Sequence, residues 1–122
     1  MENIKFIREI MSTSSLRSRM KPVGIVLVYP MHNGNVAKLS CHSDGVSVRI
    51  VSKTLGLVDR TFFPFASYFA KKRCSPGAPP WDQHIENGEW YFSQYPHCLP
   101  TNSDFKKLSS AVEEYLSMMD TV

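Results

Sequence analysis

The stretch VGIVLVYPMHNGNVAKLSCHSDGVSVRIVS, residues 23–52, contains three apolar runs separated by two turn sequences. The first run, 23–31, is short and rich in valine, so it predicts a buried strand rather than a helix. The Asn33-Gly34 pair after it favours a tight hairpin turn, because both central positions of that turn require positive φ. The second run, 36–42, is therefore expected to return antiparallel to the first.

The third run indicates which face of this sheet is buried. After the turn sequence 43–45, apolar β-branched residues alternate with polar residues over 46–52. Alternation with a period of two buries one face of a strand and leaves the other face in water. A turn at Leu55-Gly56 and a run at 57–63 predict a fourth strand, so the strands form an antiparallel meander.

Helical periodicity is found at the two ends of the chain and in one short middle segment. Residues 3–11 predict an amphipathic helix, and Pro64 suits the first position of a short middle helix that closes at 71–73. The C-terminal helix carries an apolar stripe formed by Phe105, Leu108, Val112, Leu116 and Met119. We therefore predict an α+β fold: an antiparallel meander of four to six strands, with an N-terminal helix, a short middle helix and a C-terminal helix packed on the sheet.

Size and composition predict one domain over residues 1–122, in which 1–21 form the N-terminal helix and a polar connector. Hydrophobic residues make up 43% of the chain and charged residues 20%, values that exclude a disordered protein. No apolar run approaches the roughly 18 residues of a membrane helix, so no membrane partner is expected. Three cysteines without regular spacing (Cys41, Cys74 and Cys98) argue against a disulfide scaffold and favour a cytoplasmic location.

Charge is distributed unevenly along the chain. Residues 21–80 contain eight basic and two acidic side chains, whereas residues 81–122 contain two basic and seven acidic ones. The two parts could attract each other in the fold, or a basic face could be turned toward an acidic partner. In the C-terminal helix two lysines precede three acids (Lys106 and Lys107 before Glu113, Glu114 and Asp120), which opposes the helix dipole, and only Asp104 follows the rule. One interpretation is that these lysines contact a partner.

Motifs that carry chemistry are not found. The sequence has no phosphate-binding glycine loop, dinucleotide fingerprint, zinc-protease helix or nucleophile elbow. The doublets Cys41-His42 and His97-Cys98 lack Cys-x-x-Cys spacing, and two neighbours on a strand face opposite ways. Cys98 with a histidine base would be a nucleophile candidate, but packing is the commoner role of such a cysteine. We therefore predict no catalytic residue, no metal site and no cofactor, and we expect that the protein is not an enzyme.

Aromatic and basic clusters are the candidate contact residues. A predicted strand presents three aromatic residues in succession after the Asn87-Gly88 turn, and a basic run ends the predicted middle helix. Trp and Tyr anchor many protein interfaces. The predicted partner-binding residues are Trp81, Trp90, Tyr91, Phe92, Lys71, Lys72 and Arg73.

These observations leave three functional hypotheses. The first is a small non-enzymatic binding protein of the inhibitor, immunity or adaptor type, whose partner is another protein. The alternative is a nucleic-acid-binding protein that uses the basic middle segment, and the second alternative is a Cys/His-dependent enzyme or metal-binding protein. A contiguous positive face would favour nucleic acid, and a large exposed apolar patch would favour a protein partner.

Overall fold

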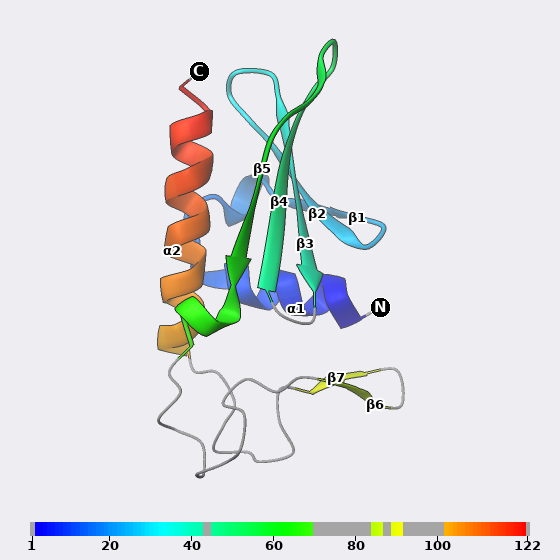
Figure 1. The fold of residues 1–122 in the computed structure, drawn as a ribbon, viewed down its shortest axis with the longest axis vertical. Helices are drawn as coiled ribbons and strands as arrows, with labels where there is room; N and C mark the ends of the chain where they lie inside the picture. Colours follow the sequence, from blue (N-terminus) through cyan, green and yellow to red (C-terminus); the bar gives the residue numbers. More distant parts are fainter. Residues whose placement is uncertain (1, 43–44, 70–83, 87–88, 92–101, 122) are drawn as a thin grey trace.

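The computed structural model describes residues 2–42, 45–69, 84–86, 89–91 and 102–121. A five-stranded antiparallel sheet, ordered β1-β2-β3-β4-β5, carries two helices on one face (Figure 1). The strands are β1 (Lys21–Val23), β2 (Val26–Pro30), β3 (Val36–His42), β4 (Gly45–Ser52) and β5 (Gly56–Pro64). The helices are α1 (Glu2–Ile10) and α2 (Asn102–Met119), and a separate hairpin pairs β6 (His84–Glu86) with β7 (Glu89–Tyr91). The α+β class and the antiparallel sheet are confirmed.

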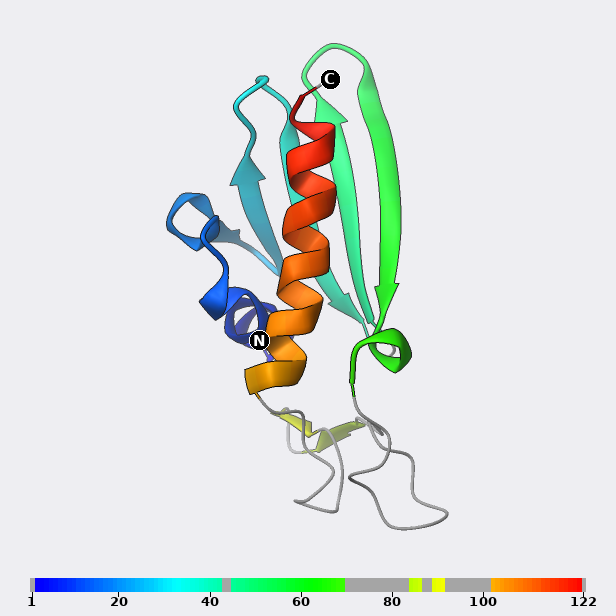
Figure 2. The same cartoon turned by 90° about the vertical axis from the view of Figure 1, so that its left-hand side faces the viewer.

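The core lies between the helices and one face of the sheet. The register places Leu27, Leu39 and Val48 side by side on neighbouring strands, and all three side chains are buried. Figure 2 shows α2 running in front of the strands along their length. The predicted stripe of α2 is confirmed, since Phe105, Leu108, Val112 and Leu116 are buried while Met119 is partly buried.

The first predicted strand is in fact two strands. A tight turn at Gly24 and Ile25 separates β1 from β2, and Val23 pairs directly with Val26. Gly24 has a φ of 62°, a conformation that residues with a Cβ rarely adopt. The turn escaped prediction because a single glycine between valine and isoleucine resembles an interruption within one apolar run.

The prediction of a middle helix was wrong for the residues that the structure describes. β5 continues through Pro64, and one short 3₁₀ turn, Phe65–Ser67, follows it. The rings of Phe65 and Phe69 stack at a centroid separation of 4.8 Å and are both buried. This stacking explains the helix-like spacing of the aromatic residues without a longer helix. The basic run 71–73 lies outside the described residues.

Candidate functional site

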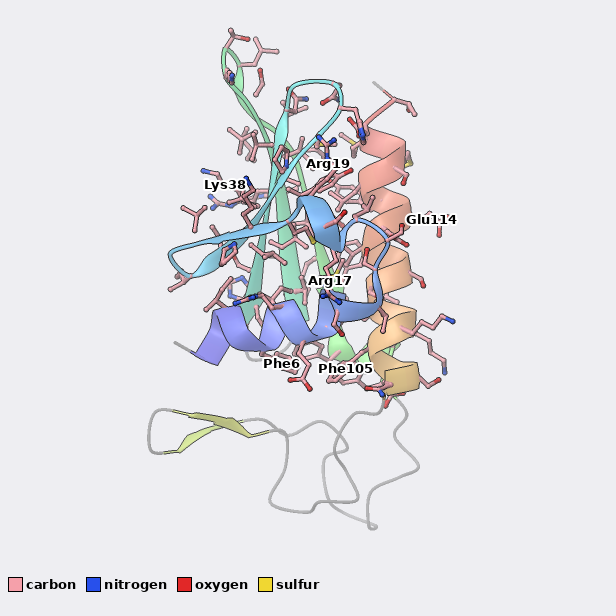
Figure 3. The ribbon with its side chains drawn as sticks, turned by 180° about the vertical axis from the view of Figure 1, so that it is seen from behind. Phe6, Arg17, Arg19, Lys38, Phe105 and Glu114 are labelled. Carbon is pink, nitrogen blue, oxygen red and sulfur yellow. The ribbon has the colours of Figure 1, made fainter. Side chains whose placement is uncertain are left out.

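The sheet has a second face, which we call the open face, formed by the side chains that point away from α1 and α2. In Figure 3, Lys38 lies on the side of the strands away from α2, whereas Glu114 projects from the outer surface of that helix. The open face is formed by Lys21, Val28, Val36, Lys38, Ser40, Ser47, Arg49, Val51, Arg60 and Phe62. None of these side chains is buried, so no described element covers the face.

Four cations lie in one line across the open face. Lys21 pairs with Val28, Val28 with Lys38, Lys38 with Arg49, and Arg49 with Arg60. We call Lys21, Lys38, Arg49 and Arg60 the cationic row. Neighbouring strands are about 4.8 Å apart, so the row spans roughly 19 Å from β1 to β5.

Within the described residues, no carboxylate forms an ion pair with the cationic row. The acid nearest in sequence is Asp59, but it lies opposite Ile50 and therefore faces the helices. There it accepts a 2.6 Å hydrogen bond from the Tyr115 hydroxyl. Burial, together with this bond and the charge of Asp59, raises the pKa of Tyr115 well above its usual value. Like charges directly opposite each other destabilise a sheet, so the row opposes stability.

Two different rows flank the cationic row. On one side Ser40, Ser47 and Phe62 lie in register, and on the other side Val36 and Val51 continue toward Leu57. A hollow of about 400 Å³ is lined by residues of the paired strands β4 and β5. Its lining includes Ser47, Arg49, Arg60 and Phe62. Cationic, hydroxyl and aromatic groups therefore meet at one place on the open face.

The ring of Phe62 has a defined position on this face. A Cβ added to Gly45 would lie 2.6 Å from Cζ of Phe62, so the ring occupies space that only a glycine leaves open. The His42 ring lies beside it, with centroids 6.4 Å apart and planes inclined by 47°. His42 is itself held by a 2.7 Å hydrogen bond between its Nε2 and Oγ of Ser47. Phe62 nevertheless remains 43% exposed.

Glu113 of α2 has structural partners on the side of the molecule away from the open face. Glu113 accepts hydrogen bonds from the Ser14 hydroxyl at 2.7 Å and from the Ser15 backbone N–H at 2.8 Å. Partial burial raises the pKa of Glu113, but the hydrogen bonds from Ser15 and Ser14 outweigh it and lower the pKa overall. This explains an acid in the second half of α2, because Glu113 fixes the connector after α1 to the helix.

Asp120 fixes the β2–β3 hairpin in the same way. Its carboxylate accepts hydrogen bonds from the backbone N–H groups of His32 and Asn33, at 3.1 and 2.9 Å, and contacts Nδ1 of His32 at 2.8 Å. Burial raises the pKa of Asp120, but these bonds, with that to the His32 ring first, lower it overall. Within the described residues, Glu113 and Asp120 thus bond to serine, backbone N–H and imidazole groups rather than to lysine or arginine, and the cationic row is exposed on the opposite face.

The structure leaves the predicted contact residues untested. Lys71, Lys72, Arg73, Trp81 and Phe92 lie outside the described residues. Trp90 and Tyr91 belong to β7, where they pair with Ile85 and His84 of β6. The strand predicted there is confirmed for these two positions.

Cys41 and His42 face opposite ways, as expected for neighbours on a strand: the thiol is buried in the core and the imidazole is exposed on the other face. Burial raises the pKa of the Cys41 thiol to about 12. Among the residues that the structure describes, no group of three histidine, cysteine or carboxylate side chains is arranged to hold a metal ion. The doublet at 97–98 lies outside that part of the chain.

No protein-family model matches this chain. Comparison with curated proteins and with solved structures gives no match either. Of the described helices, neither combines the length and the apolar character that crossing a bilayer requires. Function is therefore inferred from the open face itself.

Proposed function

We propose that this protein is a nucleic-acid-binding protein that contacts its ligand through the open face of the sheet. The observation that carries the proposal is the cationic row, with Lys38, Arg49 and Arg60 on three successive strands. Phosphate groups are the common target of such rows, because lysine and arginine side chains displace the counterions that surround a nucleic acid.

The placement of the charges supports this proposal more than their number does. A sheet gains stability from opposite charges across its strands and loses it from like charges. Arg49 has a cation on each side, and no described carboxylate pairs with any of the three. A polyanion laid across the strands would neutralise them all at once.

The test is an anisotropy titration of the full chain with fluorescein-labelled oligonucleotides at several salt concentrations. Because no base-specific contact is proposed, we expect a Kd on the order of 1–100 μM near physiological salt, and tighter binding at lower salt. The double variant Arg49→Gln with Arg60→Gln should bind more weakly and lower the slope of log affinity against log salt by about 1.4 for single strands.

The matched control removes the same charge from another surface. Lys106 and Lys107 are both exposed in the first turns of α2, so Lys106→Gln with Lys107→Gln gives the same net charge. This variant should bind like the original protein. Equal loss in both variants would indicate a response to net charge alone and would contradict a site on the open face.

A protein partner is the second candidate, and the exposed β4–β5 turn favours it. Leu55 is 81% exposed at this turn, and Leu57 and Val58 beside it are 53% and 42% exposed. A binding protein of the inhibitor, immunity or adaptor type would use such apolar tips, together with the predicted aromatic contacts at 81 and 90–92. Affinity capture from the native host, with and without nuclease, separates the candidates. Capture that survives nuclease and is lost in Leu55→Ser with Leu57→Ser supports the protein partner.

We also propose a cytoplasmic location, which the three irregularly spaced cysteines support. Fractionation of native cells with an antibody against the chain tests it. Recovery with the membrane or secreted fraction would contradict it.

A further inference from the structure

The cationic row does not explain why the ring of Phe62 is half-exposed on the open face. Phe62 lies two residues from Arg60 on β5 and opposite Ser47 on β4, so it occupies the row adjacent to the cations. An exposed phenylalanine forgoes the free energy that burial of the ring would supply. On the same strand Phe63 is buried, so β5 gives one ring to the core and one to the open face.

The surroundings of Phe62 hold the ring in place while its outer side remains accessible. Gly45 leaves the space beneath the ring, and His42, oriented by Ser47, lies at its side. An aromatic ring fixed in this way can receive a planar group without losing much conformational freedom. The hollow of about 400 Å³ adjoins the same ring, with two arginines on its border.

We infer that the ligand of the open face is a single-stranded nucleic acid, with one base stacked on Phe62 and its neighbouring phosphates on Arg49 and Arg60. This inference rests on the proposed function. Base faces are covered by stacking within a duplex and are accessible in a single strand, so a stacking ring beside a row of cations discriminates between them. Sheets that present aromatic rings next to basic side chains are an effective platform for single strands for this reason.

The experiment compares single-stranded and duplex probes on the full chain. The probes are fluorescein-labelled oligo(dT) and oligo(U) of about 20 nucleotides, which exceeds usual site sizes, and a mixed-sequence duplex of equal length. Wild-type protein should bind the single strands at least about fivefold more tightly than the duplex at the same salt concentration. Equal affinity for the two kinds of probe would overturn the inference.

Variants at Phe62 separate stacking from apolar contact. Phe62→Leu keeps an apolar side chain without a π-face, and we expect it to weaken single-strand binding by on the order of tenfold without changing the salt slope. Phe62→Trp should retain or strengthen binding. Duplex binding should be unchanged in both variants. Wild-type affinity in Phe62→Leu would overturn the role of stacking.

The outcomes also distinguish the single-strand inference from the proposed function on which it rests. If the arginine double variant loses binding while single strands and duplex bind equally, the open face binds nucleic acid and only the single-strand inference fails. If wild-type protein binds neither probe at low salt, the proposed function fails and the inference fails with it. Thermal melts of each variant show that the compared proteins are folded, and the wild-type ratio of affinities decides the question even if one variant does not fold.

Discussion

Arg49 on β4 lies directly opposite Arg60 on β5, with Lys38 on its other side, and no described carboxylate pairs with either arginine. Sheet stability alone would favour an acid at one of these positions. The repulsion falls as salt screens the charges, because exposed groups interact weakly beyond the Debye length. The relationship therefore predicts a specific response of stability to mutation and salt.

Arg49→Gln should leave the free energy of unfolding unchanged or raise it by up to about 0.5 kcal/mol, because it removes a like charge from between two others. The gain should be largest at low salt and should fade as salt is added. Urea denaturation at two salt concentrations measures this change in the free energy of unfolding, with Lys107→Gln as the control. A loss above about 1 kcal/mol would mean that the guanidinium makes a stabilising contact.

Asp120→Asn should lower stability by about 1–2 kcal/mol at neutral pH, because charge-assisted bonds to the β2–β3 hairpin are weakened. The folded-state pKa of Asp120 lies below its ordinary value of 3.8. Its contribution is therefore complete above that value and is lost as the pH falls through the lower folded-state pKa. Denaturation curves of the variant and the original protein should converge once the pH falls below the folded-state pKa of Asp120. Glu114→Gln, an exposed change on α2, should show no such difference.

Gly45→Ala should destabilise the protein by more than about 1 kcal/mol, because the added Cβ meets both a side chain and the backbone. It would lie 2.6 Å from Cζ of Phe62 and 2.9 Å from Cα of Pro64. Combining the change with Phe62→Ala should restore only the part that comes from the ring. Thermal and urea unfolding of the two single variants and the double variant separate the contribution of the Phe62 ring from that of the backbone. Full restoration would show that the backbone accommodates the extra atom.

Cys41 should resist alkylation at pH 8 in the folded protein and react readily in denaturant, because its buried thiol has a pKa of about 12. The same shift makes the folded state hold a proton that the unfolded state releases above about pH 8.5. The thiol therefore contributes stability that is complete below that pH and is lost as the pH rises toward 12. Peptide mapping after iodoacetamide treatment identifies Cys41 among the three cysteines. Rapid labelling of the native protein would contradict the burial.

Leu116→Ala should lower the free energy of unfolding by on the order of 2–5 kcal/mol, the usual range for a fully buried leucine. Met118 lies on the same helix and is 59% exposed, so Met118→Ala should change stability by less than about 0.5 kcal/mol. Denaturant midpoints compare the stabilities of the two variants. A loss below about 1 kcal/mol for Leu116→Ala would indicate that α2 does not pack on the sheet.

The sequence predicted the elements with strong periodicity and missed the features that depend on tertiary pairing. The alternation over 46–52 was sufficient to predict β4, and the apolar stripe was sufficient to predict α2. The turn at Gly24 was missed because its flanking residues are both apolar. The short turn after Pro64 has the spacing of a helix, because stacked rings four residues apart occur in either structure.

The cationic row was also missed, although its signal was present. Lys38, Arg49 and Arg60 are each 11 residues apart, and the predicted turns lie midway between them. The turns place the three cations on successive strands, but their exact pairing also depends on a register irregularity between Ile50 and Val51, which the sequence does not show. The predicted basic site at 71–73 followed local charge density instead. The position of the Phe62 ring could not be predicted from the sequence, because it depends on the space that Gly45 leaves open in the folded structure.

Each strand of the sheet pairs with its neighbour in sequence, whereas Glu113 on α2 binds a serine 99 positions earlier. Hairpins that close short loops form within microseconds, but a contact of that length requires almost the whole chain. During synthesis the five strands therefore leave the ribosome well before α2. Until α2 arrives, the apolar face that it covers is available to chaperones and to other chains. The yield of folded protein is then expected to depend on how quickly this last helix docks.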